Sequence, residues 1–295
     1  MHINNLFKEK GLVFSFEIFP PKVTSPIETI YDTLEELRDL KPDYISVTYG
    51  AGGSSKGNKT SELSSLVKSK YGIEPLAHLT CINSNKDFME KILQELKEKK
   101  VENILALRGD VLGKTKISGD FNNACKLIEY IKRNKGFGIS AACYPEGHIE
   151  SKNLQQDIEV LKMKVESGAE HLISQLFFDN NCFYNFLDKA EQKGIKVPIQ
   201  AGIMPVTNKR QIEKIVSLCG ANVPLKFIKI LEKYEYDKEA LRDAGIAYAM
   251  DQIVDLISTG VRGIHLYTMN NPYIAKKINE NIGSVINSIN KKQVG

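Results

Sequence analysis

The sequence predicts a single (β/α)₈ barrel with extra helices between the seventh and eighth strands. Eight apolar segments, each followed by an amphipathic segment, recur at intervals of about 30 residues along the 295-residue chain. The apolar segments are continuous runs rather than alternating patterns, which is typical of parallel strands covered by helices. No Pro/Gly/Ser-rich linker divides the chain, so residues 1–295 are expected to form one domain. A doubly wound open sheet is the alternative fold.

The first predicted strand, Phe14–Ile18, ends before Pro20 and Pro21, neither of which can donate a hydrogen bond to a sheet. The period of two places its apolar side chains on one face and Glu17 on the other. A carboxylate among phenylalanines is costly to desolvate unless it is paired or protonated. Glu17 is therefore either an outward-facing residue on an edge strand or a neutral acid with a raised pKa that donates a proton.

The remaining elements follow the same strand–helix order. Ser25, Pro26 and Glu28 predict a capping box that opens a helix ending near Leu40. The other predicted strands are Tyr44–Thr48, Pro75–Thr80, Asn103–Arg108, Gly138–Tyr144, His171–Leu176, Val197–Ala201 and Gly263–Thr268. The other predicted helices are Thr60–Tyr71, Lys86–Lys99, Asn122–Arg133, Leu154–Ser167, Cys182–Lys193, one capped by Thr207, Leu225–Lys233, Lys238–Ser258 and one from Pro272.

Composition excludes several classes of protein. The net charge of +4 comes from 40 basic and 36 acidic residues that are mixed along the chain, so no nucleic-acid partner is predicted. No signal peptide or transmembrane run is evident, so no membrane association is expected. The five cysteines lie far apart and form no C-x-x-C pair, which favours a reduced, cytoplasmic protein without a metal site.

Polar and aromatic side chains gather at the C-terminal ends of the predicted strands, where barrels of this class carry their active sites. They are Glu17, Thr48, Tyr49, His78, Thr80, Arg108, Gly109, Asp110, Tyr144, Glu146, His148, Gln175, Phe177, Phe178, Gly202, Met204, Tyr267 and Thr268. Their concentration favours an enzyme with a large planar ligand. Taken alone, His78 is more simply interpreted as a satisfied core histidine.

The tripeptide Arg108-Gly109-Asp110 directly follows an apolar run. Its glycine lets a ligand approach the backbone, its arginine suits a phosphate, and its aspartate suits the edge of a heterocycle. An ordinary Arg–Asp ion pair at a turn explains the same spacing equally well. No G-x-G-x-x-G fingerprint follows the first strand, so a Rossmann-type dinucleotide site is not indicated.

In chain order, the strand ends resemble those of methylenetetrahydrofolate reductase of the short, bacterial, single-domain type. The matching stretches are Phe16–Lys22, Ser46–Ala51, His78–Cys81, Ala106–Asp110, Ala142–His148, Leu161–Ala169, Gln175–Asp179, Gly202–Val206 and His265–Asn270. They cover nearly the whole chain, from the first strand to the eighth.

The resemblance implies a (β/α)₈ barrel that carries FAD and acts in one-carbon metabolism, on the route to methionine. A reduced donor, NADH or NADPH, passes hydride to the flavin, which then reduces 5,10-methylenetetrahydrofolate to 5-methyltetrahydrofolate. Glu17 matches the general acid that protonates the folate as its five-membered ring opens, and Asp110 matches the residue that contacts the pterin and tunes the flavin. Gln175 matches a substrate-contacting glutamine, and Tyr267 is expected on the substrate side.

The FAD-binding positions of the family are matched by Thr48, His78, Arg108, Gly109, Asp110, Tyr144, His148, Asp157 and Lys164. Asp157 and Lys164 lie two turns apart on one predicted helix, so both can face the same ligand. By charge, Arg108 and Lys164 are the natural partners of the diphosphate.

The chain departs from the family pattern at several positions. Lys209 replaces an aromatic residue that often stacks on substrate or nicotinamide, and Asn271 replaces an arginine that can meet the folate tail. Val160 and Met163 replace polar residues. The electron donor is therefore open among NADH, NADPH and a partner redox protein. The alternative functions are a flavoprotein subunit of a larger redox complex and a flavin-free barrel using a lysine; a homo-oligomer is expected.

Overall fold

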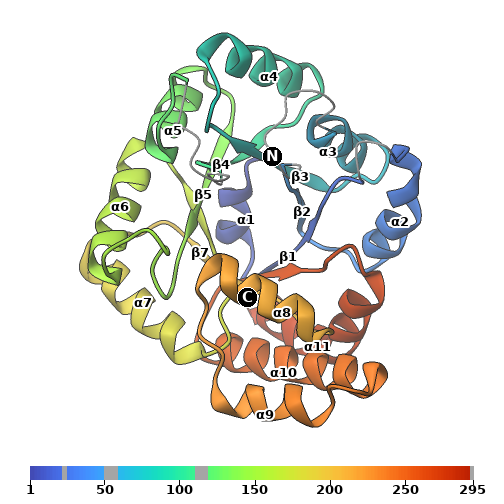
Figure 1. Ribbon diagram of the computed structural model, residues 1–295. Helices are drawn as coiled ribbons and strands as arrows, with labels where there is room; N and C mark the ends of the chain where they lie inside the picture. Colours follow the sequence, from blue (N-terminus) through green and yellow to red (C-terminus); the bar gives the residue numbers. More distant parts are fainter. Residues whose placement is uncertain (22–24, 50–58, 110–118, 293–295) are drawn as a thin grey trace.

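The computed structural model is a closed barrel in which eight parallel strands pair in chain order and β8 closes onto β1 (Figure 1). The structure describes residues 1–21, 25–49, 59–109 and 119–292. The strands are β1 (Val13–Ile18), β2 (Tyr44–Val47), β3 (Glu74–Thr80), β4 (Asn103–Leu107), β5 (Gly138–Cys143), β6 (His171–Ser174), β7 (Ile199–Ile203) and β8 (Gly263–Tyr267). The predicted barrel is confirmed, and the open sheet is excluded because every strand has two partners.

A ring of helices surrounds the strands in Figure 1 and covers their outer faces. Its members are η1 (Ile27–Ile30), α2 (Tyr31–Asp39), α3 (Thr60–Ser69), α4 (Lys86–Glu98), α5 (Ala124–Arg133), α6 (Leu154–Ser167), α7 (Asn180–Gln192), α8 (Lys209–Cys219), α9 (Leu225–Lys233), α10 (Lys238–Ser258) and α11 (Pro272–Lys292). Within the described ranges, none of the helices has the length and apolar character needed to cross a membrane.

Two predicted boundaries are wrong for identifiable reasons. Strand β7 begins at Ile199 rather than Val197, because Pro198 has no N–H to give to a ladder, and it continues to Ile203. The capping box at Ser25 is absent: η1 is a 3₁₀ turn without a side-chain cap. Its first carbonyl, that of Pro26, accepts from both the backbone N–H and the hydroxyl of Thr29, which closes the turn at the tighter i→i+3 spacing.

A short N-terminal helix, α1 (Ile3–Glu9), closes the lower end of the barrel and was not predicted. Figure 1 shows it across the barrel centre, and Ile3, Leu6 and Phe7 pack against interior side chains of β1 to β4 and β6. Its first turn is fixed by Asn103 at the start of β4, whose side-chain oxygen accepts from the Ile3 N–H at 2.9 Å. Seven residues are too few to carry a clear helical period, so tertiary packing decides this helix.

The extra helices between β7 and β8 are confirmed. Helices α8, α9 and α10 form a second apolar cluster with the ends of β6 and β7, in which Met204 and Val206 meet Ile212, Phe227 and Leu241. Ile215 and Val216 of α8 pack against this cluster. The insertion is therefore built around the C-terminal end of β7, beside the upper opening of the barrel.

Strand β1 places Glu17 at that upper opening, which we call the mouth. Phe14, Phe16 and Ile18 belong to the large core between strands and helices, as the alternation predicted. Ser15 and Glu17 face the barrel interior, where Glu17 lies in register with Ser46 on β2 and Tyr267 on β8. A closed barrel has no edge strand, so the interpretation of Glu17 as an outward edge residue is wrong.

Candidate active site

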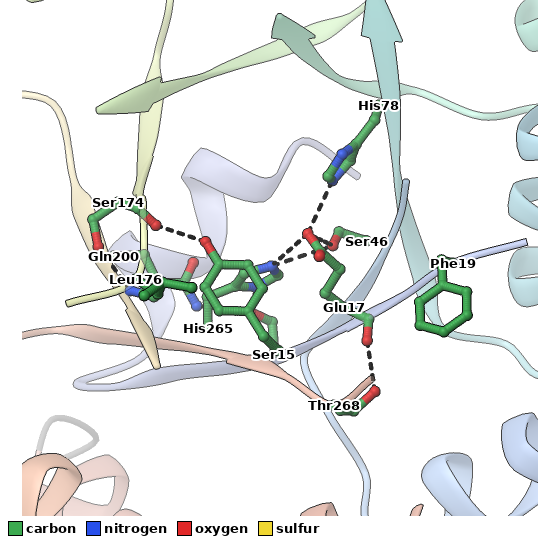
Figure 2. A network of polar contacts seen from close by, with 12 residues as sticks. Ser15, Glu17, Phe19, Ser46, His78, Ser174, Leu176, Gln200, His265 and Thr268 are labelled. Atoms are coloured by element: carbon green, nitrogen blue, oxygen red, sulfur yellow. Dashed lines mark hydrogen bonds and ion pairs between the residues drawn. The ribbon is translucent and has the colours of Figure 1, made fainter. Parts of the chain in front are cut away.

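Glu17 is the centre of the mouth, with 21% of its side chain exposed. Its Oε2 lies 3.5 Å from the hydroxyl of Ser46, 3.5 Å from Nε2 of His78 and 3.7 Å from Nε2 of His265 (Figure 2). The hydroxyl of Thr268 donates to the Glu17 backbone carbonyl at 2.6 Å. Four different strand ends, those of β1, β2, β3 and β8, thus meet around one carboxylate.

The ionisation of Glu17 differs from the sequence prediction. Burial alone raises the pKa of this carboxyl, but the hydrogen bond from His265, the charges of His78 and His265 and the hydroxyl of Ser46 together hold the pKa below its usual value. The prediction of a raised pKa is therefore wrong for the protein without a ligand. Sequence showed the phenylalanines beside Glu17, which face outward, and not the donors that the fold brings to it.

His78 is not the satisfied core histidine that the residue alone suggested. It is buried, and its Nε2 has no hydrogen-bond partner among the described residues. Burial lowers the pKa of His78 to about 4. The charge of Glu17 opposes this shift, and the charge of His265 adds to it. An uncharged ring with an unpaired nitrogen directed into the mouth is suited to a polar ligand atom.

The buried histidines give the fold a measurable pH dependence. Burial lowers the pKa of His78 to about 4 and of His171 to about 3, so below about pH 6.5 the unfolded chain takes up protons that the folded chain excludes. The free energy of unfolding is therefore highest above about pH 6.5, and it decreases as pH falls toward the pKa values of the two histidines in the folded chain. Urea unfolding between pH 7 and pH 5 should show a loss approaching ~1.4 kcal/mol per pH unit per histidine. In His171→Gln that slope should fall by about half; an unchanged slope would contradict the assignment.

The predicted cofactor side of the mouth is formed by β4, β5 and α6. Arg108 is paired through both guanidinium ends with Glu150, at 2.5 and 2.8 Å. Tyr144 and His148 contact each other edge to face, with ring centroids 4.7 Å apart. His148 Nδ1 accepts the backbone N–H of Glu150 at 3.1 Å, so the loop after β5 holds Glu150 over Arg108.

Lys164 completes this side of the mouth from α6. Its ammonium group donates to the carbonyl of Ala142 at 2.9 Å and lies 5.4 Å from the centre of the Tyr144 ring. Burial lowers the pKa of Lys164, the carboxylate of Asp157 opposes that shift, and the charge of Arg108 adds to it. Asp157 accepts from the hydroxyl of Ser151 at 2.9 Å. Asp157 and Lys164 are thus on one side of α6, as their spacing predicted.

The other predicted site residues have structural contacts in the ligand-free chain. The carboxamide oxygen of Gln175 accepts from the N–H of Leu176 at 2.9 Å, and the hydroxyl of Tyr267 donates to the carbonyl of Ser174 at 2.7 Å. The carbonyl of Thr48 accepts from Thr60, and Gly109 has a φ of +91° that a side chain rarely adopts. Asp110 and the side chain of Lys209 lie outside what the structure describes.

These residues fit an anionic, aromatic cofactor such as FAD. Two cations, Arg108 and Lys164, come from neighbouring elements, and burial lowers the pKa of Lys164 despite the opposing charge of Asp157. His78 adds a buried ring nitrogen without a hydrogen-bond partner among the described residues. The donor set therefore suits a diphosphate at the β4–α6 side and a polar heterocycle nearer to Glu17.

A set of buried polar residues beneath Glu17 was missed by the sequence reading. Ser15, Tyr44, His171, Gln200 and His265 are all buried inside the barrel and hydrogen-bonded to one another in series. The available signal was spacing: Ser15 is two residues before Glu17, and His265 is two residues before Tyr267, so each shares the inward face.

The closed barrel and the polar groups at its mouth define a (β/α)₈ enzyme. The chain belongs to the methylenetetrahydrofolate reductase family, whose model matches residues 2–283. Similar proteins include 5,10-methylenetetrahydrofolate reductase of Pectobacterium carotovorum, 35% identical over 91% of this chain and 89% of that protein, and that of Escherichia coli, 34% identical over 91% and 90%. Methylenetetrahydrofolate reductase (NADH) 1 of Arabidopsis thaliana is 33% identical, over 96% of this chain and 50% of its own length.

The family assignment gives the reaction class. The chain is an oxidoreductase of folate one-carbon metabolism that reduces methylenetetrahydrofolate to methyltetrahydrofolate. Among solved structures, an uncharacterised protein from Clostridium thermocellum that binds two copies of 5-methyl-5,6,7,8-tetrahydrofolic acid superposes with a TM-score of 0.65, covering 95% of this chain and 99% of that one. At 14% identity, this likeness shows the shared barrel fold alone.

Proposed function

We propose that this chain catalyses the reduction with bound FAD, NADH or NADPH as donor, and Glu17 as the general acid. The observation that carries the proposal is a part-buried carboxylate at the centre of the mouth, beside a histidine nitrogen that has no hydrogen-bond partner among the described residues. FAD, when bound, supplies a centre that accepts and gives up hydride. Residues 1–295 are proposed to act as one catalytic domain; a cytoplasmic location and a homo-oligomer stay predictions.

The chain's own groups have distinct parts in this proposal. Arg108 and Lys164 hold the diphosphate by charge-assisted hydrogen bonds, and His78 meets a polar edge of the bound heterocycle. Further cofactor contacts are proposed for Thr48, Gly109, Asp110, Tyr144, His148 and Asp157, and substrate contacts for Asp110, Gln175 and Tyr267. Because the carboxamide oxygen of Gln175 accepts from the backbone N–H of Leu176, it must rotate to reach a substrate.

Glu17 must be protonated before it can act as the acid. In the ligand-free chain its neighbours favour the ionised form. A folate ring in the mouth removes the remaining water and competes for the hydroxyl and imidazole donors, and both effects raise the pKa of a carboxyl. We therefore expect Glu17 to take up its proton when substrate binds rather than before.

Flavin retention should depend on Lys164 more than on Arg108. Lys164→Ala loses a charge-assisted hydrogen bond of ~1.5–3 kcal/mol, which corresponds to a roughly ten- to hundredfold weaker affinity for FAD. Arg108→Ala should cost less than tenfold, because Arg108 must first leave Glu150. Fluorescence titration of the apoprotein with FAD measures both.

Two matched variants test the same assignment. Lys162→Ala removes an exposed lysine of the same helix that faces Glu166 at 3.9 Å, and FAD affinity should be unchanged. Glu150→Gln releases Arg108 and should tighten FAD binding. If Lys164→Ala, Lys162→Ala and the parent protein bind FAD with equal affinity, Lys164 is not part of the FAD site.

One absorption spectrum and two anaerobic mixing experiments test the proposed function. The purified chain should show bound flavin, should be bleached by NADH or NADPH, and should regain its colour when methylenetetrahydrofolate is added. Bleaching by neither nucleotide, with normal re-oxidation by folate, would favour a subunit fed by a redox partner. A colourless protein that does not bind FAD would overturn the proposal and favour a flavin-free barrel.

A further inference from the structure

A series of hydrogen bonds runs down the barrel interior from Glu17 to Gln200 (Figure 2). Its intermediate members are Ser46, His265 and Ser15. The interior of a (β/α)₈ barrel is ordinarily filled with branched aliphatic side chains, so a polar series here requires that each buried donor and acceptor be matched. That requirement allows the proton positions to be worked out from the heavy atoms.

The orientation of Gln200 is fixed by the backbone. One terminal atom of its side chain lies 2.8 Å from the carbonyl oxygen of Ile264, which can only accept, so this atom must be the amide nitrogen. The other terminal atom is then the oxygen. It accepts from the hydroxyl of Tyr44 at 2.7 Å and from Nε2 of His171 at 3.1 Å, which is consistent with both of those groups acting as donors.

The orientation of Gln200 determines what Ser15 does. The second N–H of the Gln200 amide donates to Ser15 Oγ at 2.8 Å. The single proton of Ser15 can then go to Nδ1 of His265 at 2.7 Å or to the carbonyl of Ile264 at 3.5 Å. The carbonyl is the more distant and already accepts from Gln200, so Ser15 donates to His265 Nδ1.

An imidazole that accepts at Nδ1 carries its proton on Nε2. Nε2 of His265 lies 3.2 Å from the hydroxyl of Ser46 and 3.7 Å from Oε2 of Glu17. The hydroxyl of Ser46 is in turn 3.5 Å from the same carboxylate oxygen. The Nε2–H of His265 can therefore donate to Ser46 Oγ, and the hydroxyl of Ser46 can donate to Glu17, at the upper end of the series.

We propose that Gln200 is a positioning residue: by donating to Ile264 and Ser15, it holds His265 in the tautomer whose Nε2–H faces Ser46 and Glu17. The amide of Gln200 does not exchange its protons rapidly enough to relay them. The series therefore orients Glu17 and carries no proton to it from the lower end of the barrel. The proton that Glu17 uses must therefore arrive from the mouth. The consequence for folate reduction rests on the proposed function, whereas the tautomer of His265 does not.

Other titratable groups also face Glu17 and bear on its ionisation. They are His78 from β3, Tyr44 from β2, and His265 and Tyr267 from β8. Burial raises the pKa of both tyrosines, which stay neutral, and lowers that of His78. Of the described groups, His265 is therefore the one whose proton position the series controls.

Nitrogen NMR of the ¹⁵N-histidine-labelled protein, without cofactor, tests the proposal directly. The chain has five histidines, so single His→Asn variants can assign every ring. The parent should show His265 protonated on Nε2 alone. In Gln200→Met, Ser15 is free to donate to the released Ile264 carbonyl, and the Nδ1-protonated form of His265 should become detectable. Ser15→Ala, a smaller change, should have the same effect.

A second readout is the titration of the Glu17 carboxyl by ¹³C NMR. Loss of the Nε2–H donor should raise its midpoint by about one pH unit, a tenfold change in the ionisation equilibrium. Tyr44→Phe is the matched control: it removes a donor to the same amide but leaves the Ile264 contact, so tautomer and titration should match the parent. A parent His265 protonated on Nδ1 or on both nitrogens, or a tautomer unchanged in Gln200→Met and Ser15→Ala, would overturn the proposal.

Discussion

Glu17→Gln is expected to slow re-oxidation of the reduced flavin by methylenetetrahydrofolate by ~10²–10⁴-fold, the usual cost of losing a general acid. The amide keeps the size of the side chain, and its oxygen can still accept from Ser46 and His265, so the mouth keeps its shape. What is lost is the proton that the opening folate ring requires. Reduction of the flavin by the donor needs no such proton and should stay within a few-fold of the parent.

Rapid-mixing measurement of the two half-reactions separates these expectations, and the donor step is the internal control. Equal losses in both steps would show that Glu17 shapes the site rather than supplies a proton. An unchanged folate step would return Glu17 to a structural role. If Glu17 is the general acid, the rate of the folate step in the parent should decline as pH rises through the pKa of Glu17 in the complex. This pH dependence should be absent in Glu17→Gln.

Gly245→Ala is expected to cause the largest loss of stability from a single methyl group. A Cβ at Gly245 would lie 1.7 Å from the carbonyl oxygen of Val206 and 2.8 Å from its carbon, so helix α10 and the segment after β7 would have to separate. Overpacking of this kind costs ~1–3 kcal/mol even where side chains can adjust, and here the obstacle is backbone. The gain in helix propensity, about 1 kcal/mol, cannot offset it.

Gly283→Ala in α11 is the matched control for this prediction. It makes the same change within a helix, but a Cβ there meets nothing within 4 Å. It should raise the free energy of unfolding by up to ~1 kcal/mol through helix propensity. Urea unfolding of both variants gives the comparison. A Gly245→Ala protein as stable as the Gly283→Ala protein would show that α10 does not press on the end of β7.

The barrel was predictable because its signals are local and repeated. Apolar runs such as Asn103–Leu107 and the capped helix Leu154–Ser167 are readable from neighbouring residues alone. The short helix α1 was not predictable, since it depends on a surface that eight strands build together. The same limit applies at the site: alternation placed Glu17 on the face opposite Phe14, Phe16 and Ile18, but its ionisation depends on His265 and Ser46, which come from other strands.

Arg108 shows a related limit. Its residue type and its place after β4 predicted a cation at the mouth; Asp110, the partner weighed from the sequence, lies outside the described residues. The carboxylate that the structure places on Arg108, Glu150, lies on the loop after β5 and has no sequence pattern linking it to Arg108. Such pairs follow from the order of strands around the barrel rather than from spacing along the chain.

The helix α1 also constrains the order of events in catalysis. Since it closes the lower end of the barrel, we expect the donor, folate and proton of the proposed reaction to reach Glu17 from above. If the two bulky reactants of the proposed reaction share this one entrance, we expect the first product to leave before the second substrate enters. Double-reciprocal plots of rate against donor concentration, at several folate concentrations, should then be parallel lines, and excess folate should compete with the donor for the empty mouth.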